Sequence, residues 1–368
     1  MTLIKLPQQP QILRKEKVLL TGGTGFVASH VLDSLVTNGY PVVVTVRSEE
    51  KGRRLLHALS SFTAPNQIQY AIVPDISTKN VFDPILCDHG PFTYVIHTAS
   101  PYQLSFADPV ADCLNPAING TTSLLDSLHR LCPSVTRVVI TSSSAAILNP
   151  PHHRDVYDES SWSEVTWEQA MQPEHTYRAS KKFAEQAAWS FLRDNSPGFT
   201  VATINNTYTF GPLSRSLINS SRFSSAEINT SNRRIWDLVH GKWRNADGSA
   251  NIPPTAPVFT FVDVRDVADA HVAALTAPGQ RYYTVGGFFS NYQIAKVVEE
   301  EFKGVLGARG VLPDLKGQQD DFEEDKHWKF DVRRSKEELG IRYRGLRESV
   351  RDAVGSMLEF EKGVTALS

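Results

Sequence analysis

The sequence predicts an α/β fold with a doubly wound parallel sheet. Short runs of β-branched and apolar residues recur along the first 205 positions, and longer segments with a helical period separate them. These runs are apolar throughout instead of alternating with polar residues, which indicates strands covered by helices on both faces. We predict strands at residues 17–21, 41–46, 68–73, 93–97, 137–141 and 200–204.

A helix is expected directly after the first strand, over residues 25–38. Its apolar residues recur three or four positions apart, so they lie on one helix face. They are Val27, Val31, Leu32, Leu35 and Val36. Gly39 follows, and glycine commonly ends helices at this position.

The regular alternation fades after residue 205. One further strand and helix are predicted over residues 258–275, and two amphipathic helices near 291–302 and 346–360. We therefore expect a flexible N-terminal segment, a first domain and a smaller, discontinuous lobe. The segment comprises residues 1–14, the first domain 15–205 with 258–275 returning to it, and the lobe 206–257 and 276–368.

Composition excludes several classes of function. The formal net charge of -2 over 368 residues gives no field that would attract nucleic acid or an anionic membrane. No apolar stretch approaches the roughly 18 residues of a membrane span, and the N-terminus lacks the apolar core of a secretion signal. The three cysteines show no zinc-like spacing and are odd in number, which predicts reduced thiols in a cytosolic protein without a metal site.

The stretch "TGGTGFVA" places Gly22 and Gly25 between the first strand and its helix. Glycines there allow a tight turn and the close approach of a pyrophosphate. The first amides of the helix, at Phe26 and Val27, are available to bind an anion. A simple tight turn is the alternative, but the order of strand, turn and helix favours a dinucleotide cradle.

The end of the second strand indicates which dinucleotide binds. Enzymes that use NAD carry an acidic residue there for the ribose 2′-hydroxyl, whereas this chain has Arg47, 25 positions after Gly22. Arginine can pair with a 2′-phosphate, and Lys51 adds a second positive charge. A solvated charged loop is the alternative, and we expect NADP(H). Asp75, after the third strand, suits the adenine amino group or is an ordinary loop residue.

A second motif combines Tyr177 and Lys181, which lie one turn apart on a predicted helix. A lysine ammonium beside a phenol lowers its pKa, so that the tyrosine can exchange a proton near neutral pH. Upstream, "TSSSAAI" follows an apolar strand and offers Ser142, Ser143 and Ser144 as hydroxyls for a substrate carbonyl. These serines could otherwise only cap the next turn.

These motifs, together with "HTASP", "YRASK", "FGP" and "FVDVRDVADAH", resemble those of extended short-chain dehydrogenases/reductases. These enzymes form the NAD-dependent epimerase/dehydratase superfamily. The resemblance spans about residues 15–362 and is strongest to the branch of dihydroflavonol reductases and fungal aldehyde (methylglyoxal) reductases. It implies a Rossmann-type first domain that binds NADP and a lobe that binds substrate.

The resemblance also implies roles for individual residues. It assigns catalysis to Ser143, Tyr177 and Lys181, with Ser142 and Ser144 left open as alternatives to Ser143. It assigns the 2′-phosphate to Arg47 and Lys51, adenine to Asp75 and Ile76, and the ribose side to Ala99 and Ser100. Asn206 replaces a proline that the family places against the nicotinamide, so it either alters that grip or reaches toward substrate.

We therefore predict an NADPH-dependent carbonyl reductase, as a monomer or a homodimer, that acts on an aldehyde or ketone, either a small carbonyl compound or a secondary metabolite. Two alternatives remain. One is an epimerase or dehydratase that retains NAD and acts on a sugar nucleotide, which Arg47 argues against. The other is a dinucleotide-binding protein without catalysis, which the Tyr177–Lys181 pair argues against.

Overall fold

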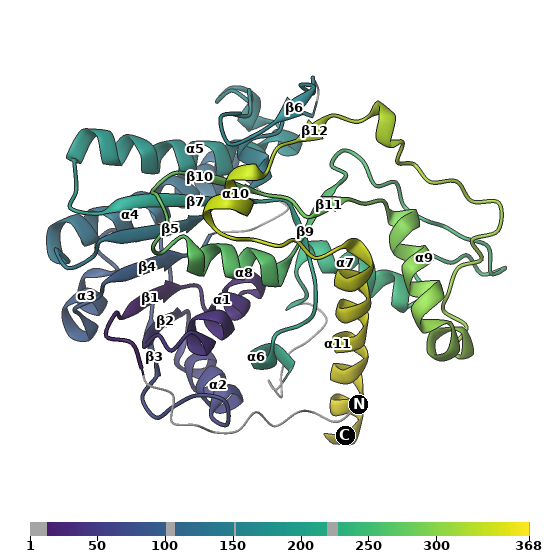
Figure 1. The fold of residues 1–368 in the computed structure, drawn as a ribbon, viewed down its shortest axis with the longest axis horizontal. Helices are drawn as coiled ribbons and strands as arrows, with labels where there is room; N and C mark the ends of the chain where they lie inside the picture. The colour runs from purple at the N-terminus through teal and green to yellow at the C-terminus, as the bar shows by residue number, and fades with distance from the viewer. Residues whose placement is uncertain (1–12, 101–106, 151, 219–226, 368) are drawn as a thin grey trace.

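A computed structural model describes residues 13–100, 107–150, 152–218 and 227–367, and Figure 1 shows its layers. Its centre is a seven-stranded sheet in the order β10-β7-β5-β4-β1-β2-β3. Every neighbouring pair in this sheet is parallel. Helices α1 and α8 pack together on one face and α4 and α5 on the other. The doubly wound α/β fold predicted from the sequence is confirmed.

The elements have the following bounds. The strands are β1 Val18–Thr21, β2 Val42–Val46, β3 Ile68–Ile72, β4 Tyr94–His97, β5 Arg137–Thr141, β6 Val156–Tyr157, β7 Thr200–Asn206, β8 Tyr208–Phe210, β9 Thr260–Asp263, β10 Arg281–Thr284, β11 Gly287–Phe288 and β12 Lys329–Phe330. The helices are α1 Phe26–Thr37, α2 Glu49–Leu59, α3 Asp83–His89, α4 Asn115–Leu131, α5 Pro173–Asn195, α6 Arg215–Ile218, α7 Thr230–Val239, α8 Val264–Ala273, α9 Asn291–Phe302, α10 Arg333–Glu338 and α11 Leu346–Leu367.

Burial on both faces explains why the central strands are apolar throughout. In β1, Val18 and Leu20 pack into a cluster with α1 and α8, whereas Leu19 packs into a separate cluster with α4. All three side chains are fully buried. Neither face of this strand meets water, so no polar residue alternates with the apolar ones.

The predicted division of the chain differs from the strand pairing at two places. Strand β10 lies within residues 276–368 but forms the edge of the main sheet beside β7. Strand β9 pairs with β8 and β11 in a separate three-stranded sheet, so residues 258–275 return to the main sheet through α8, which packs on α1. Both strands are four residues long, and tertiary pairing decides where such short segments go. Residues 1–12 of the predicted N-terminal segment lie outside the described residues.

The smaller lobe has its own core, built where α7, α9 and α11 meet. Trp236 from α7, Ile294 from α9 and Val354 from α11 are buried there beside Phe210 and Phe289. In Figure 1 these helices lie to one side of the main sheet, next to the three-stranded sheet. The lobe therefore stands against the carboxyl end of β7, from which β8 continues.

A buried ion pair joins α5 to the edge strand β10. The guanidinium Nε of Arg281 lies 2.6 Å from the Glu185 carboxylate, and both side chains are almost fully buried. Arg281 also donates to the carbonyls of Glu159 and Ser161 at 2.7 and 2.6 Å. Its guanidinium carbon lies 3.8 Å from the ring centre of Trp162. The pair thus holds a helix, an edge strand and a loop together.

We expect Arg281→Met to lower the free energy of unfolding by about 3–5 kcal/mol, because it leaves the buried Glu185 carboxylate without its counter-charge. Replacing both partners by apolar residues, Glu185→Leu with Arg281→Met, should recover part of the loss. Arg53→Ala is the control, because its pair with Glu49 is exposed and should be worth at most about 1 kcal/mol. Urea denaturation measures all three; equal losses for Arg281→Met and Arg53→Ala would contradict this account.

Candidate active site

The predicted site residues gather at the carboxyl edge of the main sheet. Because neighbouring strands are parallel, the segments that follow them all begin at this edge. Gly22 follows β1, Arg47 follows β2, Asp75 follows β3, Ala99 and Ser100 follow β4, Ser143 follows β5, and Asn206 ends β7. Helix α5 contributes Tyr177 and Lys181.

The turn after β1 needs glycine for two separate reasons. Gly22 has a φ of +75°, and a Cβ there would lie 2.9 Å from the Cα of Ala99. At Gly23 a Cβ would lie 1.7 Å from the Val44 side chain. Helix α1 then begins at Phe26, and its N-cap, Gly25, provides no side-chain cap. The first amides of the helix, including those of Phe26 and Val27, have no partner within it, as a pyrophosphate cradle requires.

The end of β4 is tied to this turn by short hydrogen bonds. The Ala99 amide donates to the Thr21 hydroxyl at 3.2 Å, and that hydroxyl lies 2.8 Å from Nδ1 of His97. Burial lowers the pKa of His97 to about 4, so the ring is neutral at pH 7. A neutral Nδ1 can accept the Thr21 hydrogen, which leaves the Thr21 oxygen to accept from Ala99. The backbone opposite Gly22 is thereby fixed.

The cations predicted for the 2′-phosphate lie on and beside α2. Arg47 is exposed directly after β2. Lys51 lies in the first turn of α2, where the hydroxyl of the N-cap Ser48 accepts its amide. Lys51 also lines a small hollow of about 40 Å³ together with Thr24 of the glycine turn. The other residues of this hollow are Arg54, Leu55, Ser216, Leu217 and Glu227. Arg47 is not among them, so the structure brings Lys51, but not Arg47, to the same hollow as the turn.

The residues predicted for adenine differ in how firmly they are held. The Asp75 carboxylate is exposed and accepts from the amide and hydroxyl of Ser77 at 2.9 and 2.7 Å. Ile76 packs against α4, where a Cβ on Gly120 would lie 2.8 Å from its Cδ1. Ile76 thus forms a fixed apolar surface, while Asp75 is oriented by its own turn.

Tyr177 and Lys181 lie one turn apart near the start of α5. The Lys181 Nζ is 5.9 Å from the centre of the Tyr177 ring and donates to the Ser100 hydroxyl at 2.9 Å. Burial lowers the pKa of Lys181 from 10.5 to about 8. The structure therefore joins three predicted residues from two elements around one desolvated ammonium group.

The structure distinguishes the three serines after β5. The Ser142 hydroxyl is buried, donates to the Glu185 carboxylate and accepts from Asn205. Ser143 is half-buried, and its Oγ accepts the Ala145 amide at 3.1 Å. In that bond Ser143 is the acceptor, so its own hydrogen is available to a ligand. Ser144 is buried and begins the short 3₁₀ helix at Ser144–Ala146. This geometry favours Ser143 over Ser142 as the serine that meets substrate.

Asn206, at the end of β7, has one engaged and one unengaged polar atom. Its Nδ2 donates to the Thr209 hydroxyl at 2.9 Å. Its Oδ1 is buried and has no hydrogen-bond partner among the described residues. A buried acceptor without a donor is costly, so a donor from a bound ligand fits this position.

Residues 213–236 were expected either to line the substrate pocket or to pack within the lobe. The described part of this segment lies in two different places. Helix α6 packs against α1 and α2, and its Ser216 and Leu217 face Lys51 across the small hollow. Ile235 and Trp236 of α7 are buried in the core of the lobe. Residues 219–226 lie outside the described part of the chain.

Two residues that hold the serine loop, Glu185 and Asn205, were not predicted from the sequence. Glu185 lies eight residues after Tyr177 and four after Lys181, so all three share one face of α5. That spacing was a readable signal, because a carboxylate on an inward-facing helix position needs a partner. Nothing in the sequence marked Asn205, whose partners come from the serine loop after β5 and from α5.

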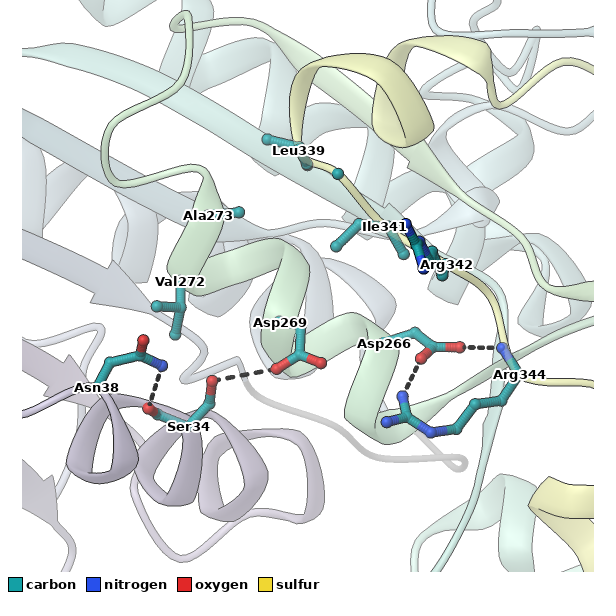
Figure 2. Close-up of a pocket in the computed structure, with 11 residues that line it drawn as sticks. Ser34, Asn38, Asp266, Asp269, Val272, Ala273, Leu339, Ile341, Arg342 and Arg344 are labelled. Carbon is teal, nitrogen blue, oxygen red and sulfur yellow. Dashed lines mark hydrogen bonds and ion pairs between the residues drawn. The ribbon is translucent and has the colours of Figure 1, made fainter.

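A larger hollow lies away from the carboxyl edge (Figure 2). It has a volume of about 420 Å³ and is bounded by the C-terminal half of α1, by α8 and by residues 339–344. Figure 2 shows Asp266 bonded to Arg344, and Asp269 bonded to Ser34. Asp266, Asp269 and Arg344 are therefore each bonded to another residue of this hollow, and none of the predicted site residues lines it.

Among the residues that the structure describes, no group of three or more histidine, cysteine or acidic side chains is placed to hold a metal ion. Within the same residues, no helix combines the length and the apolar character that crossing a membrane requires.

Comparison with known proteins extends these observations. The model of the NAD dependent epimerase/dehydratase family matches residues 18–286. The chain is 46% identical over 350 residues to the ketoreductase azaE of Aspergillus niger. The aligned region covers 94% of this chain and 98% of that protein. The chain is also 33% identical over 355 residues to the NADPH-dependent methylglyoxal reductase GRE2 of Saccharomyces cerevisiae, covering 94% and 98%.

A solved structure agrees with these relatives. Gre2 from Candida albicans in complex with NADPH superposes with a TM-score of 0.83 at 33% identity, covering 94% of this chain and 99% of that one. The family resemblance predicted from the motifs is thereby confirmed, and this chain belongs to the NAD-dependent epimerase/dehydratase family, with fungal ketoreductases and methylglyoxal reductases among its relatives.

Proposed function

We propose that this chain is an NADPH-dependent carbonyl reductase that acts on a small aldehyde or ketone. The observation that carries the proposal is the packing of α5, which holds Tyr177 and Lys181, against the short helix that directly follows Ser143, at the edge of the sheet where the glycine turn also begins. The ketoreductase and methylglyoxal reductase relatives support the same activity. A cytosolic location and a monomeric or homodimeric state stay predictions.

The described residues fit NADPH. The first amides of α1 have no partner within the helix, and Asn206 Oδ1 is a buried acceptor without a donor among the described residues. We assign the pyrophosphate to Gly22, Gly25 and the amides of Phe26 and Val27, the 2′-phosphate to Arg47 and Lys51, adenine to Asp75 and Ile76, the ribose side to Ala99, Ser100, Tyr177 and Lys181, and the carboxamide to Asn206. When bound, the cofactor supplies a hydride for the carbonyl carbon.

Ser143 would hold the carbonyl oxygen. Its Oγ already accepts the Ala145 amide, so the hydroxyl hydrogen can point to the substrate. A donor fixed in this way stabilises the negative charge that grows on the oxygen as the carbon is reduced. Ser142 cannot do the same without leaving Glu185 and Asn205.

Tyr177 would donate the proton that completes the alcohol. The Lys181 ammonium, 5.9 Å from the ring centre, favours the phenolate that remains because an opposite charge nearby stabilises it. Lys181 is itself held by Ser100. Arg47 argues against the alternative of an NAD-retaining epimerase, because an acidic residue would be expected in its place.

The proposal is tested by NADPH oxidation with a panel of aldehydes and ketones that includes methylglyoxal. We expect Tyr177→Phe to lower kcat by about 10²–10⁴-fold, the range lost with a general acid, while NADPH still binds in a fluorescence titration. Tyr343→Phe is the control, because it also removes a hydroxyl hydrogen bond, to Ser335 at 2.7 Å, far from the proposed chemistry. Turnover by Tyr177→Phe equal to that of the control would refute the role of Tyr177.

Cofactor choice is tested by reversing the charge of Arg47. Arg47→Glu should weaken NADPH binding by about 10²-fold or more, because a charge-assisted pair is lost and a repulsion gained, and should leave NADH binding unchanged or improved. Arg53→Glu makes the same change of charge on an exposed residue of α2. Isothermal titration of both variants with both cofactors separates a local effect from a general one; equal losses would assign the preference to overall charge.

We expect Lys181 to lower the free energy of unfolding, because its ammonium group is desolvated in the folded protein. At pH 7 we expect Lys181→Met to raise the free energy of unfolding by about 1–3 kcal/mol, since a tenfold change in acidity corresponds to about 1.4 kcal/mol, and to abolish turnover. Below pH 8 the lysine is charged in both states, and folding bears the full desolvation cost. Between about pH 8 and 10.5 the unfolded chain binds more protons, so the wild type gains stability as pH rises.

The stability difference between Lys181→Met and the wild type should therefore shrink across that pH window. Urea denaturation at pH 7 and at pH 9.5 measures it, and other titrating groups cancel in the comparison. A difference that stays constant with pH would show that Lys181 is not desolvated.

A further inference from the structure

We propose that Asn205 is a positioning residue that holds the serine loop at a fixed distance from α5. The inference rests on the function proposed above, because it concerns the serine assigned to the carbonyl oxygen. Asn205 is fully buried on β7, one residue before Asn206. Asn205 is buried from solvent, and its Oδ1 and Nδ2 both face neighbouring residues. It would therefore act through Ser143 and would not touch the substrate.

The side-chain amide of Asn205 reaches three acceptors. Its Nδ2 lies 2.7 Å from the Glu185 carboxylate, 3.1 Å from the Ser142 hydroxyl and 3.3 Å from the backbone oxygen of Ser143. Its Oδ1 lies 3.0 Å from the Thr203 hydroxyl, which also lies 3.1 Å from the Glu185 carboxylate. Because a carboxylate only accepts, Nδ2 and not Oδ1 of Asn205 must face Glu185. An amide nitrogen has only two hydrogens, so Asn205 is fully used by these neighbours.

Two successive residues of the serine loop are thus attached to one network. Ser143 is held through its backbone oxygen by Asn205, and Ser142 is held through its side chain by Asn205 and Glu185. The Ser143 hydroxyl belongs to a different bond, with the Ala145 amide. Asn205 therefore fixes the backbone of Ser143 without engaging its hydroxyl. A residue that positions this hydroxyl for a ligand has to act in this way.

Glu185 connects this network to the proton donor. It lies on the same face of α5 as Tyr177 and Lys181, and Arg281 balances its charge. The bonds from Asn205 therefore link the segment that would bind the carbonyl to the helix that would protonate it. A misplacement of about 1 Å between such groups can cost about 10²-fold in rate.

A double-mutant cycle of Ser143→Ala and Asn205→Ala tests the inference. With the best substrate of the carbonyl panel, Ser143→Ala should lower kcat/KM by about 10²–10³-fold, and Asn205→Ala by about 10–100-fold. In the Ser143→Ala background, Asn205→Ala should cost at most about 3-fold, because a residue that acts through Ser143 has nothing left to position. Losses that multiply would overturn the inference.

Thr141→Val is the matched control. Thr141 is the last residue of β5, two residues before Ser143. Its hydroxyl lies 2.7 Å from Nε2 of His271, outside the network of Asn205 and Glu185. Both Thr141→Val and Asn205→Ala should lower the melting temperature, but Thr141→Val should keep kcat/KM within about 3-fold of wild type, because it leaves the placement of Ser143 unchanged. An equal loss of kcat/KM in the two variants would assign the effect of Asn205 to stability and overturn the inference.

Asn205→Ser repeats the cycle if Asn205→Ala does not fold, because serine keeps a polar group in the buried site but is too short to reach Ser143. Failure of the proposed function has a separate signature. No turnover by the wild type with any carbonyl tested would refute the reductase itself. Full activity of Ser143→Ala would remove Ser143 from the reaction, and the positioning role with it.

Discussion

The buried carboxylate of Glu185 is the constraint on which the arrangement of the site depends. A charge in the interior is tolerated only when donors replace the water that it loses. Glu185 receives a guanidinium from β10, an amide from β7 and a hydroxyl from the serine loop, and Thr203 and Trp189 donate as well. Each donor comes from a segment that must stay in place for the charge to remain satisfied. The register of α5 against the sheet therefore follows from electrostatics as well as from apolar packing.

Helix α5 places two charged residues, the buried Glu185 and the half-buried Lys181, in opposite surroundings. Glu185 is surrounded by donors, whereas Lys181, one turn earlier, is desolvated, has a lowered pKa and donates to the Ser100 hydroxyl. A lysine kept in this state weakens folding, so packing elsewhere must offset its cost. The ion pair of Glu185 and Arg281 lies where it can do so, because it fixes the segment of α5 directly after Lys181. Function and stability are thus distributed along one helix face.

The elements that could be predicted from the sequence are those that depend on a local pattern of residues. Strands such as Val42–Val46 were readable because both faces are buried, and α9 at Asn291–Phe302 was readable from its amphipathic period. The partner strands of β10 and of β9 could not be predicted, because each of these strands is four residues long and its place depends on strands far away in the sequence. At the site, residue types and spacing identified Tyr177 and Lys181. They did not separate Ser142 from Ser143, because that distinction comes from bonds to Glu185 and Asn205, which lie 43 and 63 positions from Ser142.

Three consecutive residues at the end of β7 connect the parts of the molecule. Asn205 faces the network of Glu185 and the serine loop, and Asn206 presents a buried acceptor that we assign to the cofactor. Thr207 donates to the backbone oxygen of Thr260 at 2.9 Å, which ties the strand to the three-stranded sheet of the lobe. Successive residues of an extended chain point in opposite directions, so Asn205 and Asn206 meet different surroundings. A change in the lobe that moves Thr207 would therefore also move Asn206 and Asn205. This coupling gives a physical reason for the two parts to be interleaved in sequence instead of joined by a linker.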